Sequence, residues 1–446
     1  MKTIQLKISV KALDCYIYGG YIFFVMQDGR IVYGSYERFI NRAIKKIEGA
    51  TDLLKVAFLR NEHYYSKQIK SFLKIPGVKE AIYSNWNQLT NEELCLEWEE
   101  IEDLMTTVCE YESFPIDFRI YGMRMFIGCR KGLYEVNLRP AGHKLNPAKI
   151  EKCFDTSKII CVNPKFGELV ASADSDGLIA KSIDMDGNSP TFIHDSDVIQ
   201  QRSLRTGWSE VDIFNYSDTA DFSFYANEYE TVKNENGRYW EKADGKRIRS
   251  FGVRQHSMDN MLEMSRIKKE DILYCFNGAT NAFVHLKNGK LITVTLKGDR
   301  QGEVGEFTLS QYAKQVTNDS AINDFGRILS GFTIPKGCVI EYFDKVVLLR
   351  DRHAQVIEDG IAIKVRNFMS SNKYQYVLSV TKDNEVILHA IDTLDLNRDL
   401  NKGYIRTSSA EPIDLFAGMD AIPYKFIGKI EGSVDESTYK KCLREE

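Results

Sequence analysis

The feature that most constrains the fold of this chain is a hairpin pattern that recurs along it: a β-rich run, a tight polar turn and a second β-rich run. The copy at residues 23–33 turns at Asp28-Gly29. Asp-Gly and Asn-Gly pairs supply the positive φ angles that two-residue hairpin turns require. Further copies occupy residues 125–136, 169–183, 283–296 and 376–391, and weaker copies occupy residues 229–240 and 346–357. The sequence therefore predicts seven hairpins.

Seven hairpins in a chain of 446 residues are typical of a radial repeat of small sheets, the β-propeller. A blade needs about 40 to 50 residues, and the turns at Gly132 and Gly177 are 45 residues apart. The turns at Gly29 and Gly132 are 103 residues apart, so this interval holds additional structure. We expect an all-β fold, a β-propeller of about seven blades with an α-helical insertion near the N-terminus.

The long first interval contains the residues that favour helices. Periodicity predicts helices over 37–47, 66–73 and 90–108 and a strand over 53–59. The helix over 90–108 has the strongest pattern, because Thr90 and Glu93 form a capping-box pair at its start. Its apolar face would consist of Leu94, Trp98, Ile101 and Met105. Further along the chain, residues 307–316 indicate another possible helix between blades.

The two ends of the chain both contain a strand pattern. Because a propeller must join its ends to avoid an open sheet edge, we expect residues 3–9 and 424–430 to meet in one closing blade. The predicted division is a closing strand and first hairpin over 1–36 and a helical elaboration over 37–112 that may include part of a blade. The remaining blades would occupy 113–430, with long loops at 195–267. A polar tail would follow over 431–446.

One repeat resembles a known family. Residues 159–179 combine an apolar strand, a polar turn at Asn163-Pro164, a strand of small residues over 171–173 and a turn at Asp176-Gly177, followed by another strand. This order is similar to a blade of the WD40-type propellers. The Gly-His and Trp-Asp signatures of that family are absent from every repeat, so the chain resembles the β-propeller superfamily in a divergent, WD40-like form.

The sequence contains no motif for a familiar catalytic or cofactor site. Phosphate-binding glycine loops, the G-x-S-x-G elbow and the H-E-x-x-H pair are all missing. The seven histidines are dispersed, and residues 184–195 lack the glycine and glutamate that a calcium loop requires. We therefore predict no cofactor, no metal site and no catalytic residue, although propeller enzymes can build a site from dispersed residues.

Composition bears on the cellular compartment of the chain and on the class of its partners. No run approaches the roughly 18 apolar residues that a membrane span requires, so no membrane contact is expected. Nine cysteines are scattered without a Cys-x-x-Cys pair, which favours reduced thiols and a cytoplasmic protein. The net charge of −4 argues against a surface built throughout for nucleic acid.

Two charged segments are the candidate partner-binding sites. The basic segment contains Arg238, Trp240, Lys246, Arg247, Arg249 and Arg254. The acidic segment contains Glu97, Glu99 and Glu100 on the exposed faces of the predicted helix 90–108. Either segment could instead be solvated surface. The basic segment could also dock a protein, including the acidic helix of a second copy, or bind single-stranded nucleic acid.

The function that the sequence favours is a non-catalytic interaction module, because propellers present large rigid rims through variable loops. It would be a recognition, regulatory or scaffold subunit of a multi-protein complex, with protein partners and an undetermined oligomeric state. One alternative is a hydrolase or lyase with a site in the central channel. The other is a nucleic-acid-binding subunit that uses the basic segment.

Overall fold

The structure is a computed structural model of the chain. It describes residues 3–47, 51–59, 75, 77–142, 144–156, 158–183, 189–200, 202–209, 212–218, 221–229, 249–257, 259, 262, 267–278, 281–288, 291–297, 306–313, 327–334, 337–350, 353–368 and 373–391.

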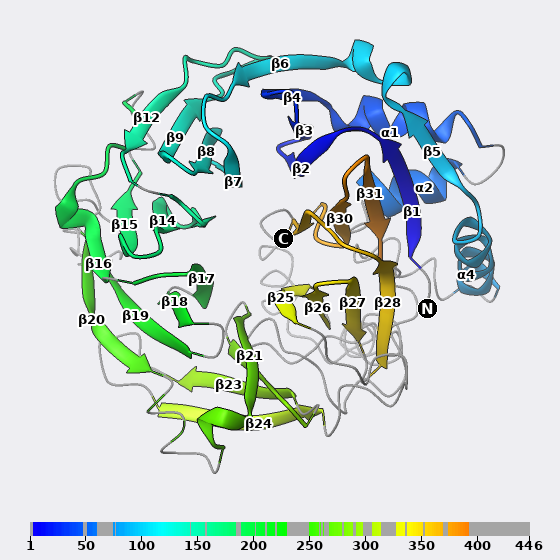
Figure 1. Cartoon of the computed structure of the whole chain (residues 1–446). Helices are drawn as coiled ribbons and strands as arrows, with labels where there is room; N and C mark the ends of the chain where they lie inside the picture. The colour runs from blue at the N-terminus through cyan, green and yellow to red at the C-terminus, as the bar shows by residue number, and fades with distance from the viewer. Residues whose placement is uncertain are drawn as a thin grey trace, which may run out of the picture.

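Seven antiparallel sheets of four blade strands each surround a common centre, so the chain is a seven-bladed β-propeller (Figure 1). Blade 1 consists of β2 (Ala12–Tyr18), β3 (Tyr21–Met26), β4 (Arg30–Ser35) and β6 (Met105–Glu110). Blade 2 consists of β7 (Pro115–Tyr121), β8 (Arg124–Cys129), β9 (Gly132–Asn137) and β12 (Glu151–Phe154). Blade 3 consists of β13 (Cys161–Val162), β14 (Glu168–Ser172), β15 (Leu178–Ser182) and β16 (Val198–Gln200).

The remaining blades follow the same order from the innermost strand outward. Blade 4 consists of β17 (Arg205–Ser209), β18 (Asp212–Asp218), β19 (Asp221–Tyr229) and β20 (Arg249–Ser257). Blade 5 consists of β21 (Ile272–Asn277), β22 (Asn281–Leu286), β23 (Leu291–Lys297) and β24 (Glu306–Ala313). Blade 6 consists of β25 (Ile328–Ile334), β26 (Gly337–Tyr342), β27 (Lys345–Arg350) and β28 (His353–Asp359). A separate two-stranded ribbon joins β10 (Pro140–Ala141) to β11 (Lys144–Leu145).

Blade 7 closes the ring with strands from distant parts of the chain. It consists of β29 (Lys364–Asn367), β30 (Val377–Thr381), β31 (Glu385–Ala390) and the first strand of the chain, β1 (Ile4–Ser9). The register pairs Ile4 with Ala390 and Ser9 with Glu385. Closure by the first strand confirms half of the prediction. The predicted partner is wrong: β31 and β5 (Leu94–Glu97) occupy the two edges of β1, and residues 424–430 lie outside the described residues.

Most of the predicted hairpin turns are confirmed. Gly29, Gly132 and Gly177 have φ angles of 99°, 124° and 102°. At Gly132 and Gly177 a Cβ atom would also lie 2.1 Å from a carbonyl oxygen of the outermost strand. Both the positive φ angle and this close approach therefore require glycine at these positions. The weak copy at 229–240 lies outside the described residues except for Tyr229, which ends β19 and pairs with Arg249 of β20.

The predicted insertion lies between the third and fourth strands of blade 1. It contains α1 (Tyr36–Ile44), α2 (Thr51–Leu59) and α4 (Val78–Leu89). The Ser35 hydroxyl caps α1 by accepting the N–H of Arg38. The strand predicted over 53–59 is wrong, because Leu54, Ala57 and Phe58 bury one face of α2 at helical spacing. The helix predicted over 66–73 lies outside the described residues.

The helix predicted over 90–108 is also wrong. Thr90 ends α4 instead of starting a helix, since its N–H donates to Trp86 O and its hydroxyl donates to Asn87 O. The following residues form β5, the short 3₁₀ turns η2 (Trp98–Glu100) and η3 (Glu102–Leu104), and β6. Pairing of β5 with β1 and of β6 with β4 outweighs the local helical pattern. The possible helix over 307–316 is wrong for the same reason, because β24 pairs along β23.

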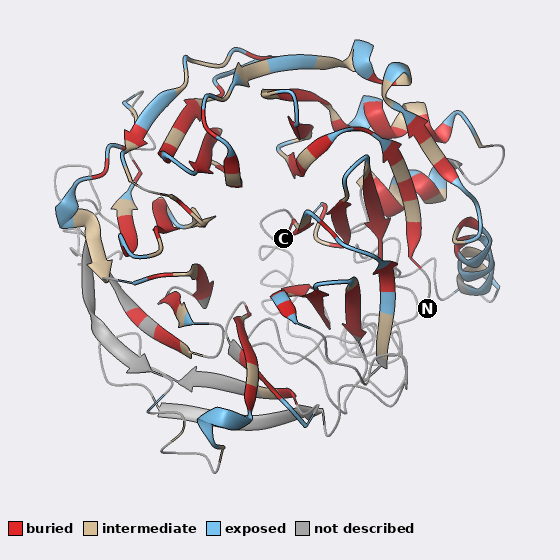
Figure 2. Ribbon diagram, viewed as in Figure 1, coloured by how far each residue is buried: buried red, intermediate tan, exposed pale blue. Residues whose placement is uncertain are grey.

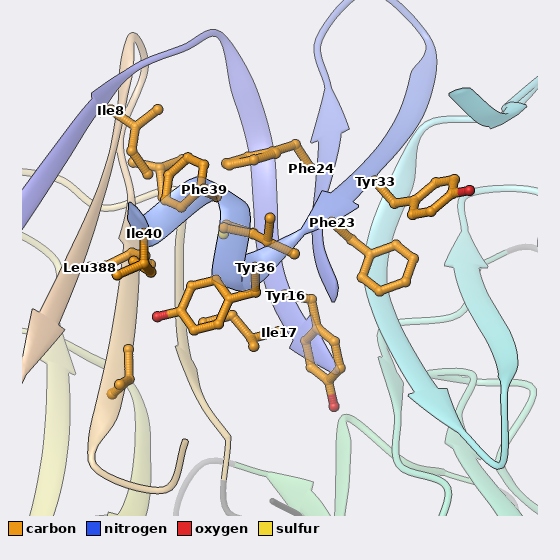
Figure 3. Close-up of a cluster of buried hydrophobic side chains, with 14 of the residues drawn as sticks. Ile8, Tyr16, Ile17, Phe23, Phe24, Tyr33, Tyr36, Phe39, Ile40 and Leu388 are labelled. Atoms are coloured by element: carbon orange, nitrogen blue, oxygen red, sulfur yellow. The ribbon is translucent and has the colours of Figure 1, made fainter. Parts of the chain in front are cut away.

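Buried residues lie mostly in the strands of the blades (Figure 2), and their apolar side chains form clusters between neighbouring blades. The largest cluster joins blades 7, 1 and 2 to the helices, and Tyr36, Phe39 and Ile40 of α1 pack there against Ile8, Ile17 and Leu388 (Figure 3). Five further clusters lie between blades 2 and 3, 3 and 4, 4 and 5, 5 and 6, and 6 and 7. Cys129 and Cys275 are buried in the core, and Cys161 is half-buried.

Candidate functional site

The propeller has two loop faces that differ in their connections. The strands of a blade alternate in direction, so the first strand begins at the same end of the blade at which the second strand ends. The linkers between blades therefore lie on the same face as the turns between second and third strands. We call this the linker face. Hydrogen bonds confirm the arrangement: Gly360 N donates to Asp344 O at 2.7 Å, and Gln27 Nε2 donates to Asp383 O at 2.9 Å.

The innermost strands carry polar residues near the linker face. Register irregularities precede the third residue of β2, β7, β21 and β25, and these third residues are Asp14, Asp117, Tyr274 and Ser330. An irregularity of this kind redirects the side chain that follows it. The polar residues therefore form a layer where the inner strands begin.

Four charged residues of this layer join blades 7, 1 and 2, and we call them the closing network: Asp14, Asp117, Lys364 and Arg366. Arg366 donates through Nε to Asp14 at 3.0 Å and through Nη2 to Asp117 at 2.7 Å. Lys364 Nζ lies 3.0 Å from Asp117 Oδ1, and the Val162 N–H donates to Asp117 Oδ2 at 2.8 Å. Burial alone would raise the pKa of Asp117, but the neighbouring cations outweigh it and hold that pKa well below its usual range.

A second polar group joins blades 4, 5 and 6. Arg205 Nη1 donates to the Tyr274 hydroxyl and, at 3.4 Å, to Leu329 O. Burial raises the pKa of Tyr274. Close by, the Ser330 hydroxyl donates to Glu341, whose pKa burial also raises. Arg205 thus has neutral partners, whereas Arg366 has carboxylates.

Exposed apolar side chains gather on the linker face of blades 6 and 7. This apolar loop surface consists of Leu329, Phe343, Ile361 and Ile363, which are 38%, 51%, 59% and 41% exposed. Backbone hydrogen bonds hold the loops together: Phe343 N donates to Arg327 O at 2.9 Å, and Ile363 N donates to Thr381 O at 2.7 Å. Side chains of this size are normally buried, and a group of them on fixed loops is typical of a contact surface.

The acidic residues predicted as a partner surface lie on a strand end and a 3₁₀ turn. Glu97 ends β5, and Glu99 and Glu100 belong to η2. Glu100 pairs with Lys46 at 2.5 Å and accepts the N–H of Glu97, so it fastens this segment to the insertion. Trp98 is half-buried and packs edge-on against Phe24 with ring centroids 5.9 Å apart.

The basic segment stays a prediction. Arg238, Trp240, Lys246 and Arg247 lie outside the described residues. Arg249 and Arg254 lie on β20, where the backbone pairs with Tyr229 and Tyr225 of β19. The acidic segment, which lies within the described residues, bonds to the insertion and forms no described hydrogen bond or ion pair with the polar layer or the apolar loop surface.

Sequence reasoning missed both of these features. A signal for part of the polar layer was present, because Asp14 and Asp117 interrupt mostly apolar strands that each precede a hairpin. Their meeting with Arg366 across three blades could not be read from the sequence. The apolar loop surface had a weaker signal, the isoleucines at 361 and 363 beside Gly360 in a linker.

Two other properties bear on the site. Within the described ranges, no group of three or more His, Cys, Asp or Glu side chains has the geometry to hold a metal ion. No helix in the same part of the chain is long and apolar enough to cross a membrane.

The sequence matches no protein-family model and no curated protein. Among solved structures, the designed propeller Ika8 matches with 8% identity and a TM-score of 0.41, over 88% of this chain and 100% of that one. The WD40 propeller domain of Doa1 matches with 9% identity and a TM-score of 0.38, over 88% and 94%. BBS1N, solved in complex with ARL6DN, matches with 8% identity and a TM-score of 0.40, over 88% and 98%. The seven sheets themselves confirm the predicted β-propeller fold.

Proposed function

We propose that this propeller is a non-catalytic interaction module that docks a protein partner on the apolar loop surface of blades 6 and 7. It would serve as a recognition, regulatory or scaffold subunit of a multi-protein complex. The observation that carries the proposal is the exposure of Leu329, Phe343, Ile361 and Ile363 on one face. A group of exposed apolar side chains on one face of a folded domain is typical of a contact site for another protein.

The backbone around the surface supports a preorganised site. Phe343 follows β26, whose core residues Val339 and Ile340 are fully buried, and Ile363 precedes β29. Because the supporting strands and loop hydrogen bonds fix the backbone, few residues need to be ordered when a partner binds. Docking on fixed loops therefore costs little conformational entropy when the partner binds.

The charges beside the surface favour a protein partner with an apolar centre and a mixed polar edge. Arg327, Asp344 and Asp359 are exposed around the apolar residues and carry both signs. An apolar centre with a polar rim is the usual anatomy of a protein contact. A cytosolic setting is part of the proposal, and it is supported by the eight described cysteines, all of which are free thiols.

The test is purification of the full chain from its own cells, followed by size-exclusion chromatography with mass measurement. We expect the wild type to carry a stoichiometric protein partner and the double variant Phe343→Glu, Ile361→Glu to lose it. Two buried charges at an apolar contact would weaken binding by at least about 100-fold. Both positions are exposed in the free chain, so its Tm should stay close to the wild-type value.

Phe192→Glu is the matched control, because Phe192 is 49% exposed and lies in the connection between the third and fourth strands of blade 3, on the opposite loop face. This variant should keep the partner. Retention of the partner by the double variant would move the contact elsewhere, with the basic segment around Lys246 and Arg247 as the next surface to mutate. A wild-type chain that carries no partner and turns over a small substrate would reverse the proposal in favour of an enzyme.

A further inference from the structure

Three tight turns lie side by side on the loop face opposite to the linker face, where first strands connect to second strands and third strands to fourth strands. They join β7 to β8, β9 to β10 and β13 to β14, at residues 122–123, 138–139 and 166–167. Hydrogen bonds connect them: Leu138 N donates to Met123 O at 2.9 Å, and Gly167 N donates to the Tyr121 hydroxyl at 2.8 Å. The turns thus form one continuous surface across blades 2 and 3.

Each of these turns holds a residue other than glycine in the left-handed region. Met123, Arg139 and Phe166 have φ angles of 59°, 42° and 55°. Among the described residues only one other that is not glycine has a positive φ angle, Asp174, and aspartate tolerates this region better than bulkier side chains do. Glycine or asparagine would take these positions at a lower backbone cost. Three costly side chains on neighbouring turns indicate a use for the side chains themselves.

The three side chains are of the types that protein contacts favour. Phe166 is 37% exposed, Arg139 is exposed and Met123 is half-buried. Aromatic residues, methionine and arginine are enriched where proteins contact one another. The Phe166 ring is held in place, because the Lys165 ammonium lies 4.4 Å from its centroid and the Trp208 ring packs perpendicular to it at 5.7 Å. The surface therefore combines a held aromatic ring with an exposed cation.

The same surface is basic. The basic turn surface, as we call it, consists of residues 121–123, 138–142, 144–150 and 163–167. It contains no aspartate or glutamate, whereas the whole chain has a net charge of −4, and its cations are Arg139, Lys144, Lys149 and Lys165. The first three are exposed, and none of these three forms an ion pair with a described residue. With Glu151, the exposed acid that follows on β12, cations still prevail.

The ribbon that carries Arg139 and Lys144 is fastened to the propeller. Leu145 is buried, and its N–H donates to the Tyr33 hydroxyl of blade 1 at 3.0 Å. At the start of the ribbon, the Arg139 N–H donates to the side-chain oxygen of Asn137 at 3.2 Å. The two cations therefore stand on a fixed backbone, so binding would order few backbone groups.

We propose that the basic turn surface docks a second protein partner, through a segment that combines acidic side chains with an apolar one. The acidic side chains would pair with Arg139 and Lys144, and the apolar side chain would pack on Phe166 and Met123. Charge complementarity of this kind steers association and selects the partner. Single-stranded nucleic acid fits less well, because a stacked base would compete with the cation and the ring that already contact Phe166. The surface lies opposite the apolar loop surface, so one chain can hold both partners and neither proposal depends on the other.

The test is selection of a phage-displayed library of random peptides on the full chain. We expect the selected peptides to combine aspartate or glutamate with an apolar residue. In fluorescence anisotropy, Arg139→Asn should raise the Kd of a selected peptide at least about tenfold. Added salt should raise the Kd of the wild type by screening. The double variant Phe343→Glu, Ile361→Glu should bind the peptide as the wild type does, which separates this surface from the apolar loop surface.

Arg202→Asn is the matched control, because Arg202 is an exposed arginine in the linker before blade 4, on the linker face. Its Kd should match the wild type. A thermal melt separates binding from folding: asparagine takes a positive φ angle more readily than arginine, so Arg139→Asn should melt at or above the wild-type temperature. A lower Tm with unchanged peptide binding would show that Arg139 serves only the ribbon and would overturn the proposal. Failure to enrich acidic peptides, or tighter binding of oligothymidylate than of the selected peptide, would overturn it as well.

Discussion

Where blades 7, 1 and 2 meet, one apolar cluster runs through all three sheets, whereas the two contacts among blades 4, 5 and 6 each have a cluster of their own. The polar residues of the two regions also differ, because those of the first region are linked by ion pairs between blades. Arg366 bridges two carboxylates from two other blades, while Arg205 bonds a tyrosine hydroxyl and a carbonyl. The first region also carries the helical insertion, with Trp86 and Phe58 in the shared cluster.

The difference follows from how the ring closes. Blades 2 to 6 are each continuous in sequence, so each can form its hairpins locally before it packs on a neighbour. Blade 7 requires the first strand of the chain to pair with a strand about 380 residues away, as Ile4 does with Ala390. Such a contact is entropically expensive to form. The closing network and the shared cluster concentrate stabilising contacts at the place where the chain must be joined.

The largest expected effect comes from Arg366→Met. Removal of this guanidinium leaves the buried Asp14 and Asp117 carboxylates without their main counter-charge, and we expect the free energy of unfolding to fall by about 3–5 kcal/mol. Arg205→Met, on the other side of the ring, should cost only about 1 kcal/mol, because it breaks hydrogen bonds to neutral groups. Urea unfolding of both variants measures the two costs.

A rescue variant checks the cause of the Arg366 effect. Combining Arg366→Met with Asp14→Asn and Asp117→Asn removes the stranded charges, so part of the lost stability should return. Equal losses for Arg366→Met and Arg205→Met would contradict the comparison between the two regions.

The two regions should also respond to acid in different pH windows. Burial lowers the pKa of His285, in β22 of blade 5, to about 4. In the unfolded chain the imidazole of His285 binds a proton near pH 6.5. Its contribution to stability is therefore fully present above pH 6.5 and is lost as the pH falls toward 4. Asp117 has a lowered pKa, so its contribution persists down to about pH 4 and is lost only below it.

Between pH 8 and pH 5 the protonation of His285 in the unfolded chain should lower the free energy of unfolding by about 2 kcal/mol. Thermal melts at the two pH values should show a smaller pH dependence for His285→Leu than for the wild type. His194→Gln is the control, because His194 is exposed, and it should behave as the wild type does. An unchanged pH dependence in His285→Leu would place the acid-sensitive group elsewhere.

The sequence was informative where local chemistry decides the structure. Asp28-Gly29 and Asp176-Gly177 specify tight turns through the backbone angles that they allow, so the hairpins and the propeller could be predicted. The helix α1 was found because its apolar residues recur at helical spacing. These signals involve residues within one turn of each other.

The sequence was misleading where distant strands decide the structure. Residues 94–97 and 105–110 have helical periodicity, yet they lie along β1 and β4 and take their conformation from those partners. The partner of β1 could not be chosen either, since the strand patterns at 385–390 and 424–430 look alike in isolation. The polar layer has the same origin: Asp14 and Arg366 meet only after the ring has closed.

The smallest expected effect concerns the acidic segment at the edge of the closing region. Glu100→Gln removes the ion pair with Lys46, but both partners are more than one-third exposed and water screens the interaction. The glutamine can still accept the Glu97 N–H that holds the turn. We expect the Tm to change by at most about 2 °C, and 1 M salt should abolish even that difference. If instead Glu100→Gln destabilises the chain as much as Arg366→Met, the exposed edge and the buried network would act as one unit, and the stability of the closing region could not be assigned to its buried charges.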